Sequence, residues 1–215
     1  MRKLFVLLML LLLTACSVGR PTVVDNTTDD QSQEEVKEEF SIGEIKDYTY
    51  INEYFDIKID LDSDWYIAND KELVEIQNAG VDMIDNEYAK KIFDEGQAAF
   101  VFYAQNISTS ENIQVIVEGL PLGNLKTEQV IKNTMAALEE TYKSQGYEVN
   151  NVEMVDIDLN GKKEKGILSN ISLNGVAITQ KQVNIAKDKY YLTVAVTALN
   201  EDSADEIFGK MSSAK

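Results

Sequence analysis

The chain has 215 residues, with 37 acidic and 20 basic side chains and a formal net charge of −17 at pH 7. So acidic a protein repels phosphate backbones, which argues against nucleic acid as a partner. It has no histidine and a single cysteine, Cys16, which excludes Ser-His-Asp and Cys-His nucleophiles, histidine metal sites and disulfides.

The N-terminus has the layout of a secretory signal. Arg2 and Lys3 precede an apolar run over residues 4–13, which is too short for the roughly 20 residues that a membrane-spanning helix needs. Leu13-Thr14-Ala15-Cys16 then resembles the lipobox of bacterial lipoproteins. That resemblance implies cleavage between Ala15 and Cys16 and a diacylglyceryl group on the Cys16 sulfur. The alternative is an ordinary signal peptide that happens to contain a cysteine.

Three parts follow from this pattern: a signal peptide at 1–15, a lipidated cysteine with an acidic linker at 16–45, and one globular domain at 46–215. The linker is rich in Asp, Glu, Asn, Thr and Ser, and such a segment buries too little apolar surface to fold. Its flexible reach would be about 27 Å. We therefore expect a protein held on the extracytoplasmic face of the cell membrane by its lipid.

Apolar alternation predicts strands and a 3.6-residue period predicts helices in the domain. The elements expected up to residue 118 are strands at 47–51 and 54–61, a helix starting at Asn69 or Asp70 and interrupted at Gly80, a helix through Tyr88, Ile92 and Phe93 that stops near Gly96, and strands at 98–105 and 112–118.

Beyond residue 118 the pattern predicts a long helix, a meander and a last helix. Those elements are a helix from Thr127 through Met135, Leu138 and Tyr142 to Gly146, strands near 147–159, 163–173, 176–187 and 190–199, and a helix capped by Asn200 with Ala204, Ile207, Phe208 and Met211 on one face. Asn160-Gly161 and Asn174-Gly175 are strong hairpin signals. The fold class is α+β, with an antiparallel sheet of about six to eight strands packed with helices.

One acidic run matches the first half of a calcium loop, Asp156-x-Asp158-x-Asn160-Gly161. The loop requires a bidentate Glu at its twelfth position, where this chain has Ile167. The same residues are explained as strand positions that lead into a hairpin. We therefore predict no metal and no cofactor, and leave open a weak cation site at Asp156, Asp158 and Asn160.

A second run, Asp60-x-Asp62-x-Asp64, departs further from the calcium pattern. Trp65 stands where the loop needs glycine, and Lys71 stands where it needs Glu. Its simplest interpretation is a strand end followed by a turn, with Trp65 as a core side chain.

The aromatic strand Tyr54–Leu61 that runs into the turn at Trp65, followed by a helix, a meander and a closing helix, resembles the PsbP-like lipoproteins of Gram-positive bacteria. The resemblance covers roughly Tyr48 to Met211. It implies an α/β/α sandwich and a non-catalytic, partner-binding role, and it supplies no catalytic residues.

The first functional hypothesis is a non-enzymatic, membrane-anchored lipoprotein that binds a protein or envelope component. The alternatives are a carboxylate-dependent hydrolase of envelope polymers and a transporter's solute-binding lipoprotein. A pocket that holds two carboxyl groups with raised pKa values would favour the hydrolase. An exposed apolar patch without such a pair would favour the binding protein.

Overall fold

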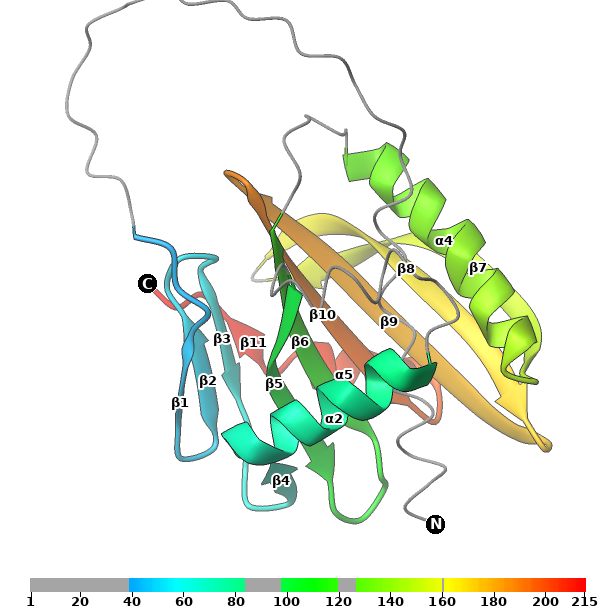
Figure 1. The fold of residues 1–215 in the computed structure, drawn as a ribbon, viewed down its shortest axis with the longest axis horizontal. Coiled ribbons are helices and arrows are strands. Elements are labelled where there is room, and N and C mark those ends of the chain that lie inside the picture. The colour runs from blue at the N-terminus through cyan, green and yellow to red at the C-terminus, as the bar shows by residue number, and fades with distance from the viewer. Residues whose placement is uncertain (1–38, 84–97, 120–126, 160) are drawn as a thin grey trace, which may run out of the picture.

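The computed structural model describes residues 39–83, 98–119, 127–159 and 161–215 (Figure 1). Within these residues, strands β1 to β11 form two antiparallel sheets, and the helices are α2, α4 and α5. This confirms the predicted α+β class. The expected helix through Tyr88, Ile92 and Phe93 lies outside the described residues, as do Ala15, Cys16 and Asn160.

The smaller sheet was not predicted as a separate unit. It has the order β1-β2-β3-β11 and consists of β1 (Glu44–Lys46), β2 (Thr49–Asn52), β3 (Ile57–Asp60) and β11 (Met211–Ser212). The predicted strand at 47–51 was wrong at its start because Asp47 has φ 53° and turns the chain between β1 and β2. Met211 was expected on the last helix, but it pairs with Ile59 in β11.

The larger sheet has seven strands, within the predicted number, in the order β4-β5-β6-β10-β9-β8-β7. The strands are β4 (Trp65–Ile67), β5 (Ala98–Asn106), β6 (Asn112–Gly119), β7 (Glu148–Leu159), β8 (Lys162–Leu173), β9 (Val176–Lys187) and β10 (Tyr190–Ala198). β4 was not predicted, although Trp65 is buried as expected. Asn174 and Gly175 both have positive φ at the β8–β9 turn, as an Asn-Gly hairpin requires.

Different elements cover the two faces of the larger sheet. On one face, the smaller sheet and α5 (Glu201–Phe208) pack on the apolar side chains of β6, β9 and β10 in the main core. On the other face, α2 (Asp70–Met83) packs on β5, and α4 (Thr127–Ser144) packs on β7 and β8. The central strands β6, β10 and β9 therefore run between the two main helices of that second face.

Predicted caps set the ends of the helices. Asn69 Oδ1 accepts from the Glu72 N–H, and Glu72 Oε2 accepts from the Asn69 N–H, which is a capping box. Asn200 Oδ1 likewise accepts from the Ser203 N–H at α5. Gly146, with φ 83°, follows the end of α4. The expected interruption at Gly80 was wrong, because α2 continues through it to Met83.

Within the described residues, no helix is both long enough and apolar enough to span a membrane.

Candidate functional site

A pocket of about 120 Å³ lies at the end of the larger sheet where β6 begins and β10 ends. Four chain segments meet there: the β5–β6 turn, the start of β7, the β8–β9 hairpin and the end of β10. The lining residues are Thr109, Ser110, Glu111, Tyr147, Leu173, Val176, Ile178, Thr197, Ala198 and Leu199.

The walls of the pocket are largely apolar, and its rim is exposed. Val176 and Leu199 line it and are 53% and 52% exposed. Ile107, in the turn that carries the lining residues 109–111, is 68% exposed. Apolar side chains that surround a pocket mark a surface suited to binding.

Tyr147 is the one aromatic residue among the described residues that line the pocket. Gly146 turns the chain after α4, and the Tyr147 N–H then donates to the Tyr142 carbonyl at 3.0 Å. The Tyr147 ring packs edge-on against that of Tyr142, with 6.0 Å between centroids. Its hydroxyl is buried and has no hydrogen-bond partner among the described residues. Burial raises the pKa of Tyr147 to about 12, so the hydroxyl stays neutral.

Glu111 supplies a fixed negative charge at the same pocket. Its carboxylate accepts from Thr109 Oγ1 at 2.9 Å and from the Leu199 N–H at 3.3 Å. These two contacts join the β5–β6 turn to the end of β10. The pocket is thus a largely apolar cavity whose lining also includes Glu111 and several hydroxyl-bearing residues.

Polar side chains extend inward from the pocket along β6, β10 and β9, on the sheet face that carries α2 and α4. They are Asn112, Gln114, Glu118, Thr193, Thr197, Gln180, Gln182 and Asn184, and all are buried. We call these eight residues the polar floor. Thr197 belongs both to the pocket lining and to this floor.

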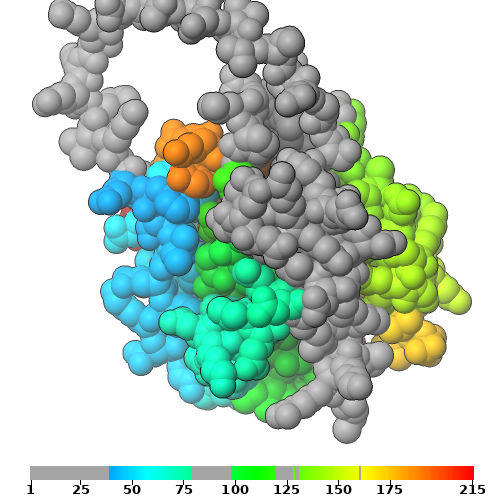
Figure 2. Space-filling model, in the orientation of Figure 1, coloured from blue at the N-terminus to red at the C-terminus, as the bar shows by residue number. Residues whose placement is uncertain are grey.

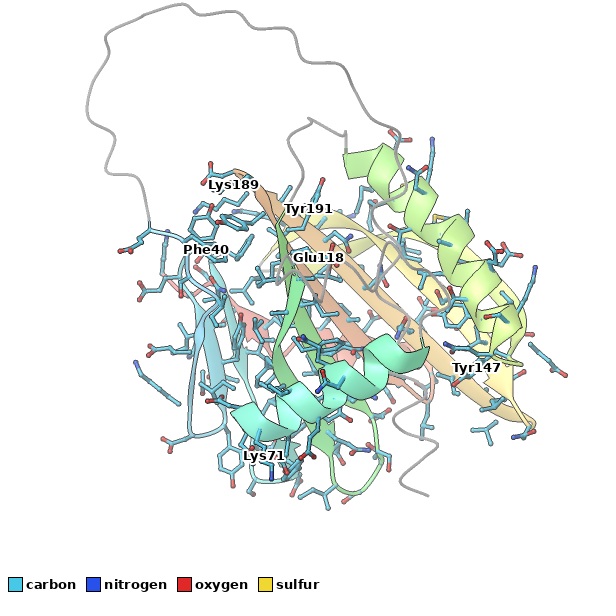
Figure 3. All side chains as sticks on the ribbon, in the orientation of Figure 1. Phe40, Lys71, Glu118, Tyr147, Lys189 and Tyr191 are labelled. Carbon is cyan, nitrogen blue, oxygen red and sulfur yellow. The ribbon has the colours of Figure 1, made fainter. Side chains whose placement is uncertain are left out.

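Glu118 lies at the far end of the polar floor (Figure 3). It is 6% exposed, and its cross-strand neighbours are Ala98 on β5 and Tyr191 on β10. Burial raises its pKa to about 7. A second acid is not among those cross-strand neighbours, so the strand pairing does not form a carboxyl pair.

The two acidic runs singled out by sequence are used locally. Asp156 pairs with Lys165 across the β7–β8 hairpin at 2.5 Å, which lowers the pKa of that carboxyl. Asp158 Oδ1 accepts from the Gly161 N–H at 2.9 Å. The third residue of the expected cation site, Asn160, lies outside the described residues.

Asp60 and Asp62 are held in a similar way. Asp60 accepts from Thr49 Oγ1 at 2.9 Å and pairs with Lys58, while Asp62 Oδ1 accepts from the Asp64 N–H. Among the described residues, no group of three or more acidic, histidine or cysteine side chains is placed to hold a metal ion.

Sequence reasoning missed the pocket because its lining comes from four separated segments. Tyr147 and Thr197 are 50 residues apart and meet only through strand order. The sequence did contain one indication of the pocket. Val176 and Leu199 are apolar residues directly beside predicted turns, and turns at a protein surface usually carry polar residues.

No protein-family model matches the chain, and no curated protein sequence does either. Solved structures with a similar arrangement include a protein from Bacteroides thetaiotaomicron, at 12% identity and TM-score 0.39 over 78% of this chain. That match spans 48% of the Bacteroides protein, about half of its length. Another is LpqN, involved in cell envelope biogenesis of Mycobacterium tuberculosis, at 14% identity and TM-score 0.41 over 73% of this chain and 82% of LpqN. The PsbP-like resemblance stays a prediction.

Proposed function

We propose that this protein is a lipid-anchored, extracytoplasmic binding protein without catalytic activity. Its partner is a protein of the cell envelope, and the pocket at the end of the larger sheet receives one apolar side chain of that partner. The observation that carries the proposal is this pocket, which combines apolar walls, exposed apolar residues at its rim and the unpartnered Tyr147 hydroxyl.

The size of the pocket supports a side chain as its occupant. An apolar cavity of about 150 Å³ accommodates a benzene molecule, so a volume of about 120 Å³ suits one aliphatic or small aromatic group. Binding sites between proteins are commonly built around one such buried anchor.

The charge of the chain narrows the partner further. Glu111 lies at the pocket, and the whole chain carries −17. Opposite charge on the partner accelerates encounter and suppresses wrong pairings. The segment that enters the pocket is therefore expected to carry lysine or arginine beside its apolar anchor.

The tether is the second part of the proposal, and it depends on Cys16. Two acyl chains hold a protein stably at a membrane, at about 0.8 kcal/mol per buried CH₂ group. The described chain starts at the end of the larger sheet opposite the pocket, near Phe40 and Lys189 (Figure 3). β9 alone has 12 residues between these ends, a length of about 40 Å. A linker that enters there leaves the pocket facing away from the membrane.

One observation favours the alternative, a carboxylate-dependent hydrolase of envelope polymers. Glu118 is a buried acid with a pKa of about 7, and such a group suits general acid catalysis. Hydrolysis of a glycoside by this chemistry requires a second carboxylate about 5 to 10 Å away. The neighbours of Glu118 on the adjoining strands supply none, and we therefore prefer the binding function.

The proposal is tested by crosslinked pull-down of the lipidated, full-length protein from its native membrane. Val176→Lys places a charge in the pocket wall, whereas Val74→Lys changes a residue of equal type and similar exposure on α2. We expect the wild type and the Val74 variant to retain the same protein partner and the Val176 variant to lose it. Equal retention by both variants, or recovery of polymer fragments alone, would contradict the proposal.

A further inference from the structure

The central strands of the larger sheet have an unusual distribution of polar side chains. Toward the smaller sheet, β6, β9 and β10 present the apolar residues Ile113, Val115, Val117, Val183, Leu192, Val194 and Val196. On the opposite face, the same strands present the polar floor together with the apolar residues Ile116 and Ala195. All eight floor side chains are buried, and buried polar groups normally have hydrogen-bond partners, so the partners of this floor need to be accounted for.

Two glutamines lie in one row of this floor. Gln114 on β6 and Gln182 on β9 both pair with Ala195 on β10, which lies between them. Neighbouring strands are about 4.8 Å apart, so the two backbones are about 10 Å from each other. Ala195 itself belongs to a small buried apolar cluster with Ala98, Phe100 and Ile116, so the two glutamines flank an apolar contact.

The side-chain amides of this row have no hydrogen-bond partners among the described residues. Gln114 is 0% and Gln182 is 2% exposed, and in both residues the carbonyl oxygen and the amino group are buried without a hydrogen bond. Asn112 Oδ1, one row closer to the pocket, is in the same condition. Buried polar atoms are nearly always hydrogen-bonded in folded proteins, so five atoms in two adjacent rows indicate a missing polar partner.

A hydrogen-bonded glutamine on the same floor provides the contrast. Gln180 accepts from the Tyr142 hydroxyl at 2.8 Å and donates to Thr197 Oγ1 at 3.3 Å. Both the oxygen and the nitrogen of this amide therefore have a partner within the chain. The amides of Gln114 and Gln182, one row further along, have no such partners among the residues that the structure describes.

The chemistry of the floor specifies the missing partner. Carboxamides and hydroxyls both donate and accept hydrogen bonds, and no lysine or arginine is among the eight floor residues. Its one acid, Glu118, lies two rows away from the glutamine row. We propose that Gln114, Gln182 and Asn112 form a binding site for a small uncharged polyhydroxyl ligand, of the class of a polyol or a single sugar ring.

The site is distinct from the proposed protein-binding pocket and would stand even if no protein bound there. The two adjoin at Thr197, which lines the pocket and pairs with both Asn112 and Gln180 across the sheet. The pocket is therefore the expected approach to the floor.

The test follows the side-chain amide resonances of the isotope-labelled wild-type protein by NMR during titration with glycerol, glucose and N-acetylglucosamine. We expect saturable shifts at Gln114 and Gln182 with at least one probe and little change at the partnered amide of Gln180. The proposal would be overturned if none of the three probes produced a saturable shift and the amides of Gln114 and Gln182 contacted only buried water.

A variant separates binding from packing. Gln114→Leu with Gln182→Leu removes both orphaned amides and keeps similar volume, so the double variant is expected to fold with unchanged or higher stability. It should lose the saturable response of the remaining floor resonances, including Asn112. If the folded double variant kept the full saturable shifts, the probe would bind at another site, and the proposed binding site would be wrong. If the double variant does not fold, the wild-type titration alone decides.

Discussion

The ring of Phe40 stacks on the ring of Tyr190, with 3.8 Å between centroids and 15° between planes. Tyr54 completes the cluster by meeting Phe40 edge-on at 5.5 Å. Figure 2 shows the contact as the tip of the β9–β10 hairpin against the N-terminal segment of the described chain. The pair fixes where that segment joins the domain, at the opposite end from Tyr147.

Phe40→Ala should release this segment. Aromatic pairs contribute about 0.5–1.5 kcal/mol beyond burial, so we expect a loss of roughly 1 kcal/mol in the free energy of unfolding and faster hydrogen exchange at residues 41–43. Tyr48→Ala is the control because Tyr48 is similarly exposed and stacks on no other ring among the described residues. Equal hydrogen exchange in the two variants would show that the stacking of Phe40 does not attach this segment to the domain.

Glu118→Gln should change how stability depends on pH. The folded state keeps the Glu118 proton up to about pH 7, whereas the unfolded state loses it near 4.5. The folded state therefore binds more protons over this window, and the wild type loses stability as pH rises through it. The loss is on the order of 3 kcal/mol.

Urea unfolding of the wild type and Glu118→Gln at pH 5, 6, 7 and 8 measures this effect. The profile of the variant should be flatter, while Glu139→Gln, at an exposed ion pair on α4, should keep the wild-type slope. Parallel profiles for the wild type and the Glu118 variant would contradict the buried-acid account.

Lys181→Met should loosen α5. The Lys181 side chain is 6% exposed and reaches Asp205 at 2.6 Å and Glu201 at 3.2 Å, which joins β9 to the helix. Hydrogen bonds to charged groups contribute about 1.5–3 kcal/mol, so a loss of this order is expected in unfolding experiments. Lys143→Met removes an exposed pair on α4 and should cost less than about 0.5 kcal/mol. Similar losses in both variants would contradict a special role for Lys181.

Cys16→Ser should abolish membrane retention if Cys16 carries the lipid. Fractionation of cells that express the wild type or the variant measures the share of protein in the membrane. Release of the variant into the soluble extracytoplasmic fraction is the expected result, because without acyl chains an acidic protein is repelled by anionic lipid. Unchanged retention would refute the tether.

Local signals predicted much of the fold. Asn69 and Asn200 begin helices, and Asn174-Gly175 turns a hairpin, because each acts through hydrogen bonds or dihedral angles within a few residues. The smaller sheet was missed because it joins β3 to β11, whose residues Ile59 and Met211 are 152 positions apart. A two-residue strand such as β11 has no periodicity of its own to detect.

The candidate site was less predictable for the same reason. The apparent calcium ligand Asp156 is neutralised by Lys165, a cross-strand partner that becomes visible only once the register is known. Gln114 and Gln182 are unremarkable polar residues until strand order places Ala195 between them. Sequence identified the residue types, whereas the order of the central strands decided which of them meet.

Site-specific photocrosslinking in native membranes tests the binding account most directly. A photoreactive amino acid replaces Leu199 at the pocket rim in one protein and Val74 on α2 in the other, both exposed apolar positions. The account predicts one envelope protein crosslinked from position 199, through a segment with an apolar residue beside lysine or arginine, and none from position 74. The same products from both positions, or no protein crosslinked from position 199, would contradict it.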